Sequence, residues 1–156
     1  MSHPFQKKLS QVAIVVRDIE AARKRYADFL GVPEPEIIIT EPGSNVNLKY
    51  RGHASNDAAK LAFFDLGGVA LELIEPIGND SAWAEGLDEK GERVHHLAFW
   101  TEDMKAAKDH LDEHGAPMIM RGDMGEGQYA YFDGIDNFGC FFEILEQKRT
   151  PLEDES

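Results

Sequence analysis

Four polar side chains in this chain are of types that bind a divalent metal ion together. They are one amide, one imidazole and two carboxylates: Gln11, His96, Glu72 and Glu143. Nitrogen and oxygen ligands of this kind suit zinc, cobalt, nickel or manganese. Both glutamates stand between large apolar neighbours, where a carboxylate is costly unless it is paired or bound to a metal. The four residues therefore form a candidate metal site.

These residues occupy matching places in two similar halves of the chain. The stretch 11–30 aligns without gaps with the stretch 96–115, which places Gln11 opposite His96. The stretches 71–75 and 142–146 also match, which places Glu72 opposite Glu143. Taken singly, each residue is better explained without a metal site: the glutamates would project from the convex face of a sheet, and Gln11 would be solvated. Four equivalent placements favour a metal site instead.

The internal repeat predicts two βαβββ modules, each opening with a buried strand and continuing into a helix with an aspartate N-cap. One module alone exposes an apolar sheet face, so the two modules are expected to pack together. The predicted fold is α+β, an open, curved, eight-stranded barrel-like sheet with helices outside, in a single domain. Its parts are module 1 (about 9–75), a connector with a short helix at about 80–87 (76–93), module 2 (about 94–147) and a disordered tail (148–156).

Strand alternation predicts which side chains face the hollow of this sheet. Gln11, Glu72, His96 and Glu143 fall on the concave side, in an otherwise apolar bowl. His95 and His96 are adjacent and are therefore expected to point to opposite faces. Only one of them is then a ligand, and the repeat selects His96 because it aligns with Gln11. His95 is interpreted as a residue behind the ligands or on the surface.

The length, charge and composition of the chain limit the kinds of molecule that it can bind. The chain has 156 residues, 16 basic against 29 acidic side chains and a net charge of −13. Such a charge disfavours nucleic acid and anionic membranes. No stretch approaches the length of apolar chain that spans a bilayer, and no signal peptide is recognisable. The single Cys140 excludes an internal disulfide and indicates a cytoplasmic protein. The expected partner is a small molecule.

With these residues in place, the chain resembles the vicinal oxygen chelate (glyoxalase-like) superfamily over about residues 9–147. The resemblance implies paired βαβββ modules, a homodimer, and one metal held by the first and last strand of each module. Those ligands fall on Gln11, Glu72, His96 and Glu143. Within the superfamily, the stretch 72–103 (ELIEPIGNDSAWAEGLDEKGERVHHLAFWTED) is most similar to methylmalonyl-CoA epimerases.

Two departures from that epimerase pattern matter. Such epimerases have a histidine where this chain has Gln11, and the Gln-Glu-His-Glu set instead resembles one class of glyoxalase I. Some epimerases also carry a second catalytic glutamate on the third strand of the first module. No glutamate occurs between Ser44 and His53 here.

The expected function is that of a metal-dependent epimerase or isomerase that removes a proton α to a carbonyl or an acyl thioester. Glu143 is expected to be the base, with Glu72 as its partner across the metal. One alternative is a glyoxalase I-type lactoylglutathione lyase. Another is a metal-free small-molecule-binding resistance protein of the same fold. An extradiol dioxygenase is disfavoured, because its iron site needs two histidines and Gln11 replaces the first.

Overall fold

A computed structural model describes residues 3–152 of the chain. Its strands form one mixed sheet in the order β2-β5-β6-β1-β7-β10-β9-β8-β3-β4. The strands are β1 (Gln11–Val15), β2 (Ile38–Ile39), β3 (Lys49–Tyr50), β4 (His53–Ala54), β5 (Ala58–Asp65), β6 (Ala70–Ile77), β7 (Arg93–Thr101), β8 (Met118–Met124), β9 (Gly127–Phe132) and β10 (Phe141–Glu146). The predicted repeat is visible in this order, because β2-β5-β6-β1 and β7-β10-β9-β8 are equivalent halves.

The two halves join along their first strands. β1 and β7 pair antiparallel, while each pairs in parallel with the last strand of its own module, β6 or β10. The sheet therefore has a pseudo-twofold axis between β1 and β7. The four strands expected to carry metal ligands are neighbours at its centre, in the order β6-β1-β7-β10.

The expectation of eight strands is wrong, since the sheet contains ten. The additional pair is the hairpin of β3 and β4, which belongs to the first module but pairs with β8 of the second. The Arg51 N–H extends this pairing by donating to the carbonyl of Ile119 at 2.8 Å. This crossing depends on contacts between modules, which the alternation within one strand does not reveal.

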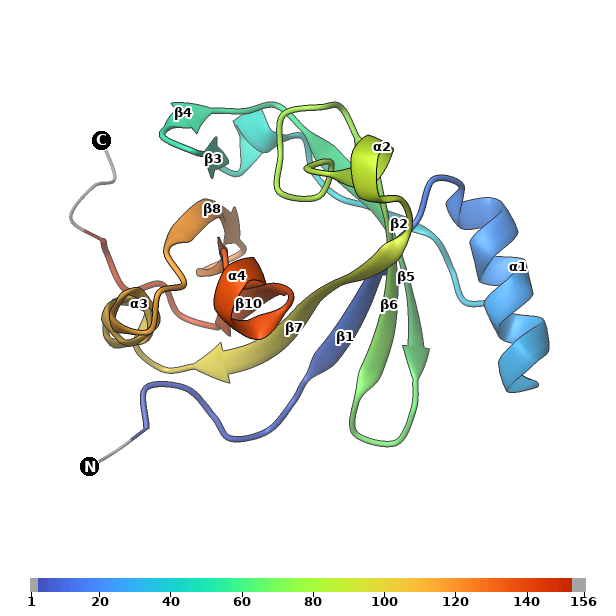
Figure 1. The fold of residues 1–156 in the computed structure, drawn as a ribbon, viewed down its shortest axis with the longest axis horizontal. Helices are drawn as coiled ribbons and strands as arrows, with labels where there is room; N and C mark the ends of the chain where they lie inside the picture. Colours follow the sequence, from blue (N-terminus) through green and yellow to red (C-terminus); the bar gives the residue numbers. More distant parts are fainter. Residues whose placement is uncertain (1–2, 153–156) are drawn as a thin grey trace.

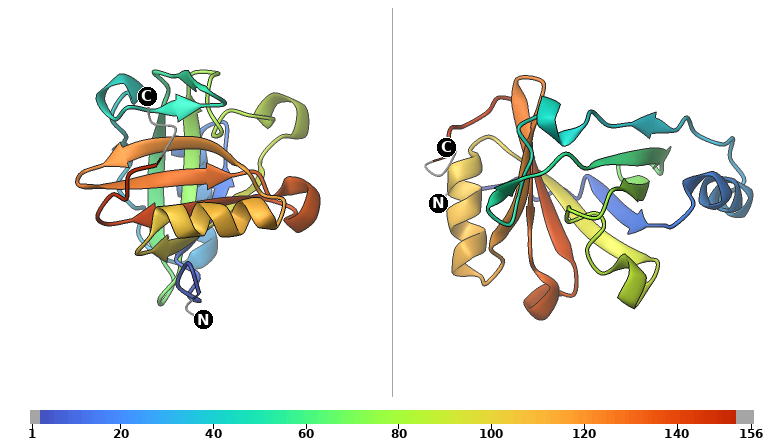
Figure 2. Two further views of the ribbon diagram at one scale, coloured as in Figure 1. Left: turned by 90° about the vertical axis from the view of Figure 1, so that its left-hand side faces the viewer. Right: turned by 90° about the horizontal axis from the view of Figure 1, so that it is seen from above.

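Two helices cover the outer face of the curled sheet, at opposite ends of the molecule (Figure 1). They are α1 (Ile19–Leu30) and α3 (Met104–Glu113), and both begin after an aspartate that caps the first turn. Figure 2 (left) shows α3 running alongside the strands of the second module. The apolar side of α1 packs on Leu73 and Phe64, and that of α3 packs on Ile144 and Phe132. These two cores hold the strands from outside and leave the concave face to other residues.

The connector differs from its prediction. Its helix α2 spans Leu87–Lys90, and the residues before it form turns instead of the helix expected at about 80–87. Ala82 and Trp83 in these turns are buried in a third apolar cluster, together with Leu48, Met120 and Phe141. Strand register places that cluster on the concave side, so the connector fills part of the expected bowl.

The remaining elements lie near the ends and turns. A 3-10 turn (Gly43–Asn45) precedes β3, and α4 (Ile135–Phe138) precedes β10. The prediction of disorder from residue 148 is wrong for the described part of that tail, since Thr150 bonds to Glu146 and Leu152 is buried. The rest of the predicted tail lies outside the described residues. Within residues 3–152, no helix has the length and apolar character needed to cross a membrane.

Candidate metal centre

The four candidate ligands project from four neighbouring strands onto one face of the sheet. In the strand register, Ala13 is paired with both Glu72 and His96, and Ala98 is paired with both Gln11 and Glu143. Paired residues in adjacent strands share a face, so all four side chains point to the concave side. The two alanines between them are fully buried, and their small side chains leave the space into which the polar groups converge.

Three of these side chains meet in a compact buried group. One ligand atom from each of Glu72, His96 and Glu143 lies within 4.8 Å of the others. Their exposed fractions are 3%, 0% and 7%. Two buried carboxylates and an imidazole that converge in this way favour a cation between them, because each carboxylate is otherwise desolvated beside the other.

Gln11 completes the group from β1. Its amide lies 3.0 Å from Glu72 Oε2 and 3.2 Å from Glu143 Oε1, in the orientation where the amide nitrogen donates to both carboxylates. The amide can also turn its oxygen inward, since the two ends have nearly the same shape. Gln11 thus satisfies the carboxylates in the absence of a cation and can offer its amide oxygen as a fourth ligand in its presence.

The Nε2 atom of His96 is the clearest sign of a ligand position. It is fully buried and makes no hydrogen bond among residues 3–152. It lies 3.3 Å from Glu143 Oε1, close enough for an ion pair but without hydrogen-bond geometry. Buried polar atoms are nearly always partnered, so this atom fits a site that a metal ion would complete.

The pKa shifts within this group also favour a bound cation. Burial raises the pKa of Glu72 to about 8, and the Glu143 carboxylate adds to this while His96 opposes it. Burial alone lowers the pKa of His96, but the Glu143 and Glu72 carboxylates outweigh it and raise that pKa above its ordinary value. Protons therefore neutralise part of this cluster in the metal-free protein. A divalent cation would take their place.

The expectation that His95 and His96 point to opposite faces is wrong. The β1–β7 register shifts at this point, so that Ala13 pairs with His96 but Ile14 pairs with Val94, and His95 is the extra residue of a β-bulge. A bulge re-aims the side chains beside it. Both imidazoles are buried, with their Nδ1 atoms 2.8 Å apart.

Tyr131 and Trp83 form the apolar wall around the ligands. Tyr131 is paired with Glu143 across β9 and β10, and its ring lies 5.0 Å from that of His96. Its hydroxyl accepts a hydrogen bond from Trp83 Nε1 at 3.0 Å. Burial, followed by the Glu143 and Glu72 carboxylates, raises the pKa of Tyr131 well above its ordinary value, so the hydroxyl stays a neutral donor. In the repeat, Tyr131 matches Phe63, which pairs with Glu72 in the same way, and this match was the available sequence signal.

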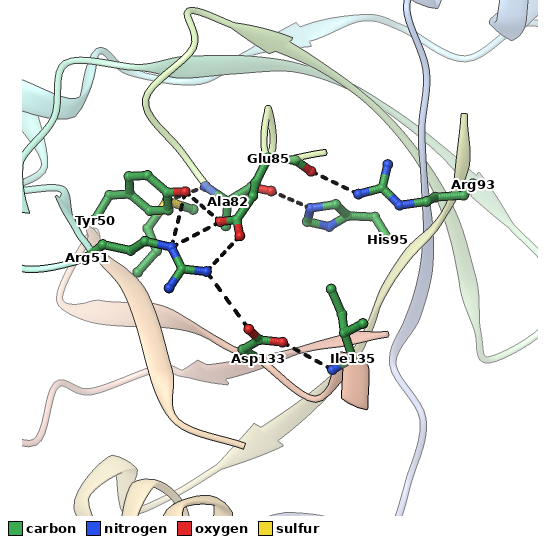
Figure 3. A network of polar contacts seen from close by, with 9 residues as sticks. Tyr50, Arg51, Ala82, Glu85, Arg93, His95, Asp133 and Ile135 are labelled. Atoms are coloured by element: carbon green, nitrogen blue, oxygen red, sulfur yellow. Dashed lines mark hydrogen bonds and ion pairs between the residues drawn. The ribbon is translucent and has the colours of Figure 1, made fainter. Parts of the chain in front are cut away.

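A polar network fastens the connector to the sheet (Figure 3). The Arg51 guanidinium donates to both carboxylate oxygens of Glu85, at 3.2 Å from Nε and 2.6 Å from the terminal nitrogen. Arg51 also lies 3.8 Å from Asp133. The same connector presents the Ala82 carbonyl to His95 Nε2 at 2.7 Å. The connector is therefore bound both to the rim of the sheet and to the histidine pair.

Comparison with known proteins agrees with this architecture. The family model of the glyoxalase/bleomycin resistance protein/dioxygenase superfamily matches residues 10–132. The ethylmalonyl-CoA/methylmalonyl-CoA epimerase of Cereibacter sphaeroides is 30% identical over 144 residues, which cover 88% of this chain and 96% of that protein.

Solved structures show the same fold. Methylmalonyl-CoA epimerase from Mycobacterium tuberculosis superposes with a TM-score of 0.62 at 20% identity, covering 97% of this chain and 93% of that one. A variant of the Streptomyces coelicolor methylmalonyl-CoA epimerase, in complex with 2-nitronate-propionyl-CoA, superposes with a TM-score of 0.60 at 25% identity, covering 89% and 96%. The paired modules, the match over most of the chain and these likenesses agree: the chain belongs to the glyoxalase/bleomycin resistance protein/dioxygenase superfamily.

Proposed function

We propose that this protein is a divalent-metal-dependent epimerase that moves a proton at the carbon α to a thioester carbonyl, with a methylmalonyl-CoA-like substrate. The observation that carries the proposal is the buried group of Glu72, His96 and Glu143. It is supported by the likeness to a methylmalonyl-CoA epimerase over 96% of that relative's length. A CoA thioester of a short branched diacid is the substrate class that this likeness suggests.

Glu72, His96 and Glu143 would hold the metal, and Gln11 would add its amide oxygen. Nitrogen and oxygen donors of this set fit zinc, cobalt, nickel or manganese. When bound, such an ion polarises the substrate carbonyl and stabilises the negative charge that develops on its oxygen. The ligands lie in an enclosed apolar setting, where that stabilisation is stronger than in water.

The proton transfer itself falls to the carboxylates. Glu143 takes the α-proton onto a carboxylate oxygen, while the electron pair of the broken C–H bond moves toward the carbonyl. Glu72 comes from β6 on the other side of the pseudo-twofold axis. As the second carboxylate of the group, Glu72 would return a proton taken up from solvent to the opposite face of the α-carbon. Return of a proton from the opposite face inverts the carbon, which is an epimerisation.

Solvent exchange tests this proposal. The metal-loaded protein, incubated in D2O with one epimer of methylmalonyl-CoA, should incorporate deuterium at C2 as the other epimer forms. Glu143→Gln should lower that rate by a factor on the order of 10²–10⁴. Glu89→Gln, on the exposed side of α2, is the control and should exchange at the wild-type rate. Undiminished exchange in Glu143→Gln would refute the choice of base, and no exchange in the wild-type protein would refute the epimerase.

A glyoxalase I-type lyase is the second candidate, favoured by the Gln-Glu-His-Glu donor set. It predicts that methylglyoxal and glutathione yield a lactoyl thioester in the presence of metal. If none forms while deuterium exchange proceeds, this candidate is eliminated. A metal-free binding protein of the same fold is the third. It predicts that elemental analysis after metal loading and dialysis finds no retained divalent ion.

A homodimer is also proposed, with the edge strand β2 as the contact. Ile38 and Ile39 on this strand are 46% and 64% exposed, and Phe29, in the last turn of α1, is 84% exposed. An exposed apolar edge strand pairs readily with a second copy. Analytical ultracentrifugation should find a dimer for the wild type and a monomer for Ile39→Lys. A monomeric wild type would contradict this contact.

A further inference from the structure

The hydrogen bonds of His95 bear on which ring nitrogen of His96 carries a hydrogen. His95 makes a hydrogen bond with each of its ring nitrogens: its Nε2 lies 2.7 Å from the Ala82 carbonyl oxygen, and its Nδ1 lies 2.8 Å from His96 Nδ1. Figure 3 shows the ring of His95 directed at Ala82 of the connector. Both rings are buried, at 2% and 0% exposure.

The direction of these bonds follows from the chemistry of the groups. A carbonyl oxygen only accepts, so His95 Nε2 must carry a hydrogen. A neutral imidazole has one N–H, which leaves a lone pair on His95 Nδ1. That lone pair can only accept from His96, so the hydrogen of this contact sits on His96 Nδ1. The lone-pair position of a neutral His96 is therefore Nε2, the atom that faces Glu72 and Glu143.

Two features of the fold hold this chain of bonds in place. The β-bulge in β7 supplies His95 as an extra residue, which regular alternation would have turned to the other face. The connector holds the Ala82 carbonyl, because the Ala82 N–H donates to Met120 Sδ and Arg93 donates to the Glu85 carbonyl at 2.8 Å. His95 thus links the connector to His96, so a shift of the connector would also change the setting of that candidate ligand.

We propose that His95 is a positioning residue for the metal site: by accepting from His96 Nδ1 and donating to Ala82, it presents His96 Nε2 to a divalent cation. This inference rests on the metal site of the proposed function. Partners that orient a ligand histidine typically contribute 10- to 100-fold to metal affinity. The same size of effect is expected here.

Two substitutions of His95 test its two hydrogen bonds separately. The amide of asparagine lies where histidine has Nδ1, so His95→Asn can still accept from His96. The amide of glutamine lies where histidine has Nε2, so His95→Gln keeps the bond to Ala82 but loses the one to His96. Calorimetric titration with Co²⁺ should give a dissociation constant about 10- to 100-fold weaker for His95→Gln. His95→Asn should stay within a few-fold of wild type, as should the surface control His114→Gln.

Nitrogen-15 NMR of the zinc-loaded wild-type protein supplies a readout that needs no variant. His96 Nδ1 should carry a proton, His95 Nδ1 should be unprotonated, and a scalar coupling should connect the two nitrogens. A proton on His95 Nδ1, or equal affinity loss in both His95 variants, would overturn the inference. No Co²⁺ binding by the wild type would instead overturn the proposed metal site, so the two failures are distinguishable without measuring activity.

Discussion

Glu75 and Glu146 perform the same structural task in the two modules. Each stands three residues after a candidate ligand, and each accepts a hydrogen bond from the first N–H of its module's helix. The Glu75 Oε1 atom lies 2.9 Å from Ile19 N, and Glu146 Oε2 lies 2.8 Å from Met104 N. A carboxylate at a helix N-terminus satisfies an orphan donor and is favoured by the helix dipole. The repeat therefore ties each last strand to its helix.

The two glutamates should differ in their effect on stability. Glu146 is 1% exposed, and its two oxygens also accept from Gln128 and Thr150. Glutamine there would turn an amide nitrogen toward a buried donor, so Glu146→Gln should lower the free energy of unfolding by about 1–3 kcal/mol. Glu75→Gln can keep its oxygen on Ile19 and loses only the partly exposed pair with Lys60, about 0–1 kcal/mol. Urea unfolding measures both, and equal losses would contradict this account.

The hydrogen bonds of Glu146 also predict that the protein loses stability in acid. Burial by itself raises the pKa of Glu146, but hydrogen bonds from Gln128, Thr150 and Met104 outweigh it and hold that pKa below its ordinary value. The stabilisation is complete above the unfolded-state pKa, 4.5, and is lost as the pH falls, because the unfolded chain takes up the proton first. The free energy of unfolding should therefore drop more steeply below about pH 5 in wild type than in Glu146→Gln. The same pH dependence of the free energy of unfolding in both proteins would refute this prediction.

Metal should reverse the order of stability between wild type and Glu72→Gln. Without metal, the variant removes a desolvated carboxylate beside Glu143 and should be at least as stable as wild type. With Co²⁺ at one hundred times its dissociation constant, wild type should gain about 2.7 kcal/mol. The variant should gain far less, because it has lost a ligand. Thermal melts with and without a chelator measure this, and an equal gain in both proteins would exclude Glu72 as a ligand.

Much of the candidate site follows from local sequence patterns. Alternation and the internal repeat were enough to predict that Gln11, Glu72, His96 and Glu143 share a face. That succeeds because a strand has a fixed side-chain period. The bulge at His95 could not be predicted in this way, since it is a property of the register between β1 and β7. Whether a strand is regular depends on its partner, and the partner was unknown.

The closure of the bowl was missed for a related reason. The expectation was an open apolar cleft, whereas Trp83 of the connector and Leu48 before β3 pack into it. Both lie in stretches with turn-like composition, whose positions depend on contacts with the other module. Cys140 stands in an apolar run that predicts a core position, but it is only partly buried. The sequence thus predicts the strands well and the covering segments poorly.

The connector should open more readily when its contact with Arg51 is weakened. Arg51 donates to both oxygens of Glu85, a geometry that lysine cannot reproduce. Its side chain is 44% exposed, so Arg51→Lys should cost only about 0.2–1 kcal/mol. Hydrogen exchange measured by mass spectrometry should show faster exchange confined to about residues 81–91, with global stability nearly unchanged.

Arg25→Lys is the matched control for this prediction, because the pair of Arg25 with Glu92 is long, at 4.0 Å, and exposed. It should leave exchange of the connector as in wild type. The Ala82 carbonyl is part of the segment that Arg51 restrains, so faster opening should also weaken Co²⁺ binding slightly in Arg51→Lys. Unchanged exchange in residues 81–91 would show that packing of Trp83 and Ala82 holds the connector without the ion pair, and would remove Arg51 from the account of access to the site.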